Sequence, residues 1–215
     1  MKIRSLLAVL MLAPAASGFA QEPDKSADPE AAYTRTITER ADKIVATLAI
    51  TNAAQSVQVR DLIAQQYRNL REIHDARDAT IKAAKEKSSG DKAEADTAIK
   101  TAQDQAKAKL DQLHGKFLAA LAAHLTPEQV DKVKDGLTYG IVQVTYNAYL
   151  KMYPDLKDEE KTKIHDWLVE AREIAMDACT SNEKHAVFGK YKGRINNYLS
   201  KAGYNAKEAE KNLSK

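Results

Sequence analysis

The sequence predicts an all-α fold, a helical bundle that contains one long antiparallel helical hairpin. Glycine and proline are scarce, at 8 and 5 of 215 residues, while Ala, Lys, Glu, Gln and Leu, which favour helices, are abundant. Apolar residues recur at three- and four-residue spacing, and no segment keeps the apolar and polar alternation that a half-buried strand needs. We therefore expect a set of helices that each bury one apolar stripe.

Residues 1–20 are typical of a cleavable secretory signal peptide. Lys2 and Arg4 precede an apolar run over residues 5–16, and residues 18–20 (Gly-Phe-Ala) form a small-residue cleavage site. The apolar run is shorter than the ~20 residues that cross a bilayer, and no later segment is apolar enough to do so. We therefore expect an exported protein, periplasmic or secreted, that is soluble after the signal peptide is cleaved.

Charge and cysteine content narrow the choice of partners. Lys2 and Arg4 account for two of the three net positive charges, so the chain after residue 20 is nearly neutral and has no electrostatic case for binding nucleic acid. The single cysteine, Cys179, excludes an internal disulfide, and the fold must depend on its core.

Residues 21–29 are polar, contain two prolines and are predicted to form a disordered leader.

Residues 30–204 are expected to form a single helical domain. Its first helix is predicted over residues 30–48, because Ile37, Ile44 and Leu48 belong to one apolar stripe. A break follows this helix before the hairpin begins.

The hairpin arms are predicted at about residues 53–87 and 91–123. Asn52 is the expected cap of the first arm, and residues 88–91 (Ser-Ser-Gly-Asp) have the composition of a turn. The apolar stripe is strong at the base of the hairpin and becomes alanine-rich and polar toward the turn. The tip should therefore project into solvent while the base joins the core.

Three more helices follow, and we expect them over residues 127–149, 158–178 and 183–201. The first of these begins with a capping box, in which the side chains of Thr126 and Gln129 each bond to the backbone of the other residue. Gly203 occupies the position of a C-terminal glycine cap after the last helix. Residues 205–215 are predicted to form a flexible tail.

The densest polar block covers residues 184–198, in a half of the chain that is also rich in aromatic residues. Gly189 and Gly193, four residues apart in one predicted helix, would let a ligand or another backbone approach closely. We predict a carbohydrate site here, in which cations and amides hold hydroxyl groups and a tyrosine ring stacks on the sugar. Its candidate residues are Lys190, Arg194, Asn196 and Asn197 for hydrogen bonding and Tyr191 or Tyr146 for stacking. Core packing of the rings and close helix packing at the glycines are the alternatives.

No motif indicates catalysis, a metal or a cofactor. The five histidines include no pair at the His-x-x-x-His spacing, and the sequence contains no phosphate loop, nucleophile elbow or paired-carboxylate motif. His185 follows Cys179 by six residues, but no third group completes a triad. A non-enzymatic protein is favoured, although an all-helical lyase needs no short motif and stays open.

A short motif resembles the Leu-Thr-x-x-Gln signature of small helical periplasmic chaperones of the Spy and CpxP type. It lies at residues 125–129 (Leu-Thr-Pro-Glu-Gln), where it is also an ordinary capping box. The resemblance implies a dimeric cradle whose exposed apolar concave face holds a polypeptide client.

Four longer stretches resemble a different family. They are residues 40–45 (Arg-Ala-Asp-Lys-Ile-Val), 63–70 (Ile-Ala-Gln-Gln-Tyr-Arg-Asn-Leu), 125–130 (Leu-Thr-Pro-Glu-Gln-Val) and 184–199 (Lys-His-Ala-Val-Phe-Gly-Lys-Tyr-Lys-Gly-Arg-Ile-Asn-Asn-Tyr-Leu). Together they are similar to an exported bacterial family, domain of unknown function three-eight-two-six, that is often described as sugar-binding. The likeness implies export and carbohydrate association, and it supplies no catalytic residues.

These observations favour an exported, non-enzymatic helical protein that binds a carbohydrate through its C-terminal half and needs no cofactor. The alternative is a Spy/CpxP-like periplasmic chaperone or envelope-stress protein with a polypeptide client. A helical polysaccharide lyase is the third hypothesis.

Overall fold

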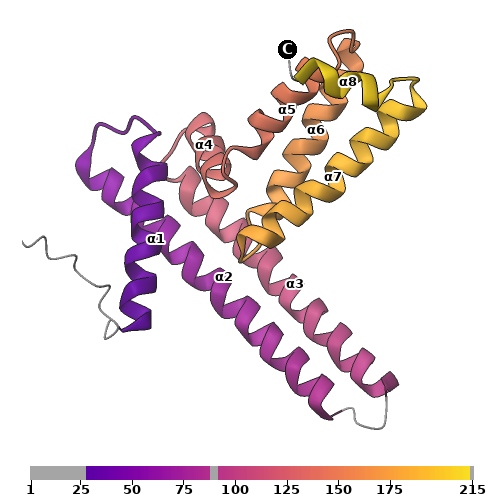
Figure 1. Ribbon diagram of the computed structural model, residues 1–215. Helices are drawn as coiled ribbons and strands as arrows, with labels where there is room; N and C mark the ends of the chain where they lie inside the picture. Colours follow the sequence, from indigo (N-terminus) through magenta and orange to yellow (C-terminus); the bar gives the residue numbers. More distant parts are fainter. Residues whose placement is uncertain (1–27, 88–91, 214–215) are drawn as a thin grey trace, which may run out of the picture.

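The computed structural model describes residues 28–87 and 92–213, and within these ranges the chain forms eight α-helices and no strand. The all-α prediction is confirmed. The predicted signal peptide and the leader up to residue 27 lie outside the described residues. Figure 1 shows α1 and α4 beside the base of the α2–α3 hairpin, and α5 to α8 gathered in a second group.

The bounds of the helices agree with most of the predicted segments. They are α1 (Pro29–Ala46), α2 (Ala53–Lys87), α3 (Lys92–Ala122), α4 (Pro127–Leu137), α5 (Ile141–Met152), α6 (Asp158–Ala175), α7 (Ser181–Lys201) and α8 (Ala206–Leu213).

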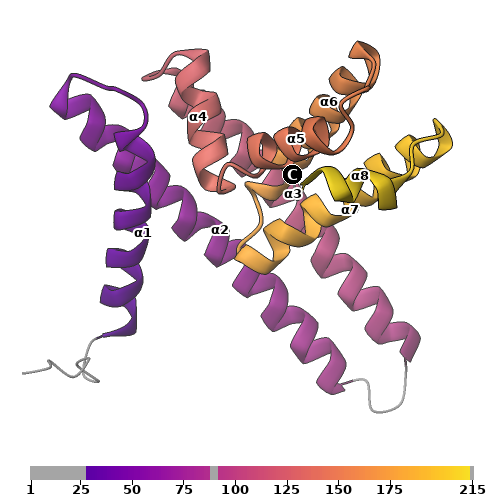
Figure 2. The ribbon, with the colours of Figure 1, turned by 45° about the horizontal axis from the view of Figure 1, so that its top comes forward.

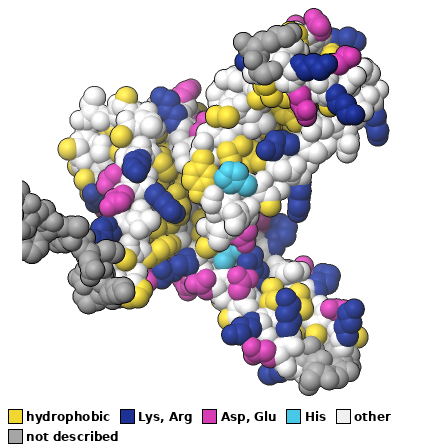
Figure 3. Space-filling model, in the orientation of Figure 1, with side chains coloured by type: hydrophobic (Ala, Val, Ile, Leu, Met, Phe, Trp, Pro, Cys, Tyr) yellow, Lys and Arg dark blue, Asp and Glu magenta, His cyan; other side chains and the backbone are white. Residues whose placement is uncertain are grey.

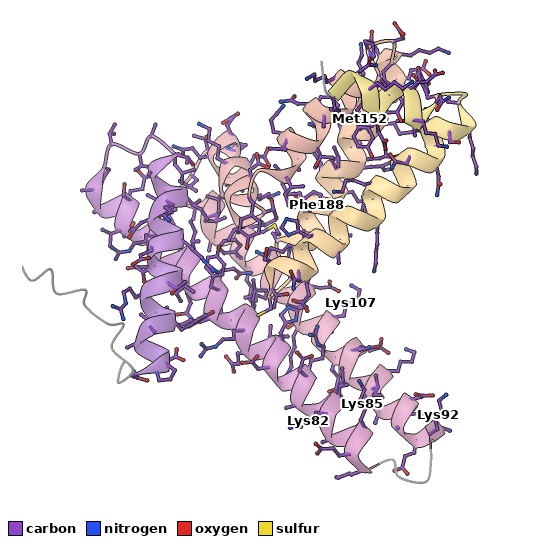
Figure 4. All side chains as sticks on the ribbon, viewed as in Figure 1. Lys82, Lys85, Lys92, Lys107, Met152 and Phe188 are labelled. Atoms are coloured by element: carbon purple, nitrogen blue, oxygen red, sulfur yellow. The ribbon has the colours of Figure 1, made fainter. Side chains whose placement is uncertain are left out.

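Helices α2 and α3 form the predicted long hairpin. With 35 residues, α2 is about 50 Å long at the usual helical rise. Toward the turn its partner α3 buries small residues such as Ala95 and Ala102, and toward the base it buries Phe117 and Leu121. Figures 1 and 2 show the turn end projecting away from the other helices, and Figure 4 labels Lys82, Lys85 and Lys92 on that part.

Side-chain caps start several helices where the sequence predicts them. Thr126 accepts a bond from the Gln129 amide at 3.3 Å, and the Gln129 side chain accepts one from the Thr126 amide at 3.1 Å. The Gln129 side-chain amide also donates to the Leu48 carbonyl, just beyond the end of α1, at 2.8 Å. The Leu-Thr-x-x-Gln motif therefore starts α4 and ties it to α1, which is a structural role.

The buried hydrophobic residues form two clusters. The first joins α1, the base of the hairpin, α4 and Met176 just after α6. The second joins α5, α6, α7 and α8 around residues such as Ile164, Leu168, Phe188 and Ile195. On the face drawn in Figure 3, hydrophobic side chains gather in the hollow between these two sides.

The prediction of one helix over residues 127–149 is wrong, because the chain breaks between α4 and α5. Tyr139 and Gly140 both have positive φ, at 60° and 65°. The Gly140 amide donates to the Asp135 carbonyl at 2.8 Å, which is the bond of a Schellman cap. A tyrosine rarely adopts the left-handed conformation, so the residue types at this position did not predict the break.

A helix, α8, replaces the flexible tail expected over residues 205–215. Ala209 is buried against the second cluster, and the Asn212 side chain donates to the Met152 carbonyl at 3.0 Å. Eight residues are too few for a stable isolated helix. Packing on α5, which periodicity alone does not reveal, stabilises this one.

Close packing in this fold occurs at a different glycine from the two that were predicted. A Cβ added to Gly189 or Gly193 would have no neighbour within 4 Å, so the alternative of close helix packing at these positions is wrong. A Cβ added to Gly136 would lie 2.7 Å from Cγ1 of the buried Ile44. Gly136 therefore allows α4 to approach α1 closely.

Three glycine-to-alanine variants test this assignment. We expect Gly189→Ala and Gly193→Ala each to raise the free energy of unfolding by about 0.5–1 kcal/mol, because alanine favours the helix and meets nothing. Gly136→Ala should lower it by about 1 kcal/mol, because overpacking against Ile44 outweighs the same helix preference. Urea denaturation measures all three, and a stabilising Gly136→Ala would contradict the close approach of α1 and α4.

Candidate functional site

The predicted site residues of α7 do not share one face of the helix. Successive residues turn by about 100°, so Tyr191 and Asn196 point about 140° apart. Tyr191 and Arg194 lie on the side toward α6, whereas Asn196 lies toward α5. Lys190 and Asn197 are exposed. The structure brings Tyr191 and Arg194 together and leaves the other candidates apart.

Asn196 and Tyr146 already have partners within the protein. The buried Tyr149 hydroxyl donates to the Asn196 side chain at 2.7 Å, which ties α5 to α7. Burial raises the pKa of Tyr149 to about 12, so this phenol stays protonated and keeps donating. Tyr146 packs edge-on against His165 of α6, with ring centroids 5.2 Å apart. Both residues therefore have a packing role in the C-terminal group.

A different set of side chains gathers on the exposed surface of α6 and α7, and we call it the aromatic platform. Its members are Lys163, Trp167 and Glu170 of α6 and Tyr191, Arg194 and Tyr198 of α7. The two helices run antiparallel, so residues near the end of one face residues near the start of the other. The platform therefore arises from the α6–α7 pairing and from spacing of three and four residues along each helix.

Rings and cations alternate across the platform. The Trp167 and Tyr198 rings meet edge to face, with centroids 5.4 Å apart. The Arg194 guanidinium carbon lies 4.3 Å from the centroid of the Trp167 ring, and the Lys163 ammonium lies 5.0 Å from that of Tyr198. Cation–π attraction of this kind orients the rings and fixes the long side chains that surround them.

Polar groups stand beside the rings. Arg194 donates to Glu170 at 3.3 Å, and the two side chains are 50% and 54% exposed. Partial burial and a hydrogen bond with Glu170 raise the pKa of Tyr191. Beside Trp167 lies a hollow of about 530 Å³ that Thr162 and Asp166 also line. The platform thus offers an aromatic ring next to exposed donors and acceptors.

Sequence reasoning found two platform residues, Tyr191 and Arg194, and missed the other four as site residues: Lys163, Trp167, Glu170 and Tyr198. A usable signal was present, because Trp167 is the single tryptophan of the chain and lies three residues from Ile164 and Glu170 on a predicted helix. The missing information was the pairing of α6 with α7, which periodicity does not specify.

Lys184, at the start of the predicted polar block, has a structural role. It is 2% exposed, and its ammonium donates to the Leu137 carbonyl at the end of α4 at 2.7 Å. The Tyr67 and Tyr139 ring centroids lie 5.8 and 5.9 Å from it. Burial lowers the pKa of Lys184 to about 8, because the interior disfavours the charged amine. This lysine joins the two hydrophobic clusters.

Residues 28–87 and 92–213 contain neither a cluster of metal-ligating side chains nor a helix that could span a membrane. No group of three or more His, Cys, Asp or Glu side chains there is placed to hold a metal ion. None of the helices formed by these residues is both long and apolar enough to cross a membrane.

The fold and the platform define a class of protein: an all-α chain with a long helical hairpin and a C-terminal helical group that exposes an aromatic and charged surface. A family model described as "Protein of unknown function (DUF3826)" matches residues 34–215, and the chain belongs to this family. The family predicted from the sequence is confirmed, and its description names no ligand. A comparison with curated proteins finds no match.

Lys184→Met tests the effect of the buried amine on stability. The folded state disfavours the charged amine, so the wild-type protein should become more stable as pH rises from about 8 toward the ordinary lysine pKa of 10.5. Between pH 7.5 and 9.5 we expect a gain of about 2 kcal/mol in the free energy of unfolding relative to Lys184→Met.

Urea denaturation at the two pH values measures this difference, and the exposed Lys190→Met is the matched control that should follow the wild type. Equal pH profiles for the wild type and Lys184→Met would show that the amine is not desolvated.

Proposed function

We propose that this is an exported, non-enzymatic protein that binds a carbohydrate on the aromatic platform of α6 and α7. The observation that carries the proposal is the partly exposed Trp167 ring, with Arg194 over it and a hollow beside it. Export is proposed from the pattern of residues 1–20. The earlier candidates Tyr191 and Arg194 belong to the site, and Trp167 replaces Tyr146 as the stacking ring.

The chemistry of the platform matches that of a sugar. One face of a pyranose ring is apolar and packs on an aromatic ring, while its hydroxyl groups both donate and accept hydrogen bonds at the edge. Glu170 and Asp166 supply acceptors, and Arg194 and Lys163 supply donors. The ion pair between Arg194 and Glu170 is exposed, so a ligand can displace it at little cost.

The chaperone hypothesis calls for a continuous apolar concave face. Among the described residues the exposed large apolar side chains are Val57, Tyr139, Val144, Ile174 and Leu213. They come from α2, the α4–α5 turn, α5, α6 and α8, and this distribution favours a localised binding site over a cradle.

The tryptophan provides a direct binding signal. We expect titration of the purified protein with polysaccharide-derived oligosaccharides to shift its emission, because Trp167 is the single tryptophan. Trp167→Ala and Arg194→Ala should each weaken binding about tenfold in calorimetry, which corresponds to about 1.4 kcal/mol of lost stacking or hydrogen bonding.

Matched controls are Lys190→Ala and Asn197→Ala, which change exposed residues of α7 that do not belong to the aromatic platform. Both should bind like the wild type. A glycan array without any bound carbohydrate would refute the proposal, suppression of client aggregation would favour the chaperone, and release of new reducing ends would favour the lyase.

A further inference from the structure

A second hollow, which shares no lining residue with the platform, lies where the hairpin meets the end of α6 and the start of α7. We call it the hairpin-base cavity, and its volume is about 740 Å³, within the range of small-molecule sites. Its walls come from α2 (His74, Arg77), α3 (Leu110, His114), the end of α6 and the start of α7. Figure 4 labels Lys107, another wall residue, where α3 passes the first turns of α7.

Most charges in the wall of the hairpin-base cavity are neutralised by neighbours. Lys107 pairs with Asp111 at 2.6 Å, and Arg77 lies 3.6 Å from Glu183. Glu173 pairs at 2.9 Å with Lys134, which lies outside the wall. Each of these carboxylates has a permanent cation within 4 Å.

Asp177 is the exception among the described carboxylates of the wall. Its Oδ2 lies 2.7 Å from His114 Nδ1, and its Oδ1 is buried without a hydrogen-bond partner. Burial raises the pKa of the Asp177 carboxyl, and the His114 side chain opposes that rise. An unpaired carboxylate oxygen in a partly desolvated wall favours a positively charged ligand.

His74 supports the same conclusion. It is 5% exposed, its Nε2 lies 2.9 Å from the Asp177 carbonyl, and its Nδ1 has no partner within the described chain. Two polar atoms of the wall, His74 Nδ1 and Asp177 Oδ1, are therefore unsatisfied, and each such group costs about 1–3 kcal/mol. Both atoms are buried, so a bound donor would recover part of this cost only after a side-chain rotation turns one of them toward the cavity.

The remaining wall of the hairpin-base cavity is apolar. Leu110, Val187 and Ile174 line it, and Ile174 is 51% exposed although it is a large hydrophobic side chain. A ligand that covered Ile174 would bury this surface. The cavity thus combines an apolar wall with a carboxylate that contacts a histidine and keeps one oxygen unsatisfied.

We infer that the hairpin-base cavity binds a small organic cation, a primary amine on an apolar body, with the ammonium at Asp177 and the body against Leu110, Ile174 and Val187. The hairpin-base cavity is proposed to bind this cation without any chemical step. His114 Nδ1 faces Asp177, and its Nε2 lies 3.8 Å from Glu173, which is beyond hydrogen-bond distance. The site does not depend on the carbohydrate proposal, since none of its residues belongs to the aromatic platform.

The test uses three six-carbon probes: hexylamine, hexanol and hexanoate. Amide chemical shifts of the ¹⁵N-labelled full chain report binding, and the Ala178 and Val187 amides should move. We expect hexylamine to bind at least tenfold more tightly than the other two. In the Asp177→Asn variant, the affinity for hexylamine should fall to that for hexanol. Ile174→Ala should weaken hexylamine binding several-fold. Ile174 is exposed, so its truncation should not impair folding.

The matched control for the charge is Asp166→Asn, an α6 carboxylate that is 71% exposed and lies outside the cavity. It should leave hexylamine binding unchanged, as should Arg194→Ala, which separates this site from the platform. Equal binding of the three probes, no shift up to the solubility limit of hexylamine, or full affinity in Asp177→Asn would each overturn the inference. None of these outcomes bears on whether oligosaccharides shift the emission of Trp167.

Discussion

Arg172, near the end of α6, forms ion pairs with Asp131 and Asp135 of α4, and we call this group the polar joint. It holds the two groups of helices together. Arg172 is 6% exposed and donates to Asp131 and Asp135 of α4, each at 2.8 Å. The Arg172 side chain reaches from α6, which packs in the second hydrophobic cluster, to α4, which packs in the first. Met176, just after α6, also packs in the first cluster. The two carboxylates are 59% and 41% exposed, whereas the guanidinium is buried, so removing them would leave a desolvated charge with less compensation.

The joint also explains why the two candidate sites differ. The hairpin-base cavity lies beside it, where the α2, α3, α6 and α7 backbones diverge and side chains cannot fill the space between them. Most charges there are paired, and the Asp177 side chain is only 17% exposed, so its one unsatisfied carboxylate oxygen has a large effect. The aromatic platform lies farther along α6 and α7, where the helices pack closely and their outer side chains face solvent. Its charges are screened, and recognition there depends on ring area and on hydrogen bonding.

Periodicity and caps were enough to predict five of the helices, including both arms of the hairpin, because those features depend on neighbouring residues in sequence. The break at Tyr139 was missed because a left-handed tyrosine is set by tertiary packing and by the Schellman bond to Asp135. The helix α8 was missed because its stability comes from α5. For the site, the polar block was recognised, but Trp167 was not assigned to it, since only the pairing of α6 with α7 brings Trp167 to Arg194.

The polar block at residues 184–198 is unusual because one helix has several separate contacts. Lys184 at its start caps α4, Asn196 near its end anchors Tyr149 of α5, and Arg194 between them covers Trp167. Gly193 faces none of these partners, and it is tolerated because buried side chains on the opposite face hold α7 in place. The mixed composition of the block therefore reflects three different neighbours around a single helix, and not one continuous ligand-binding face.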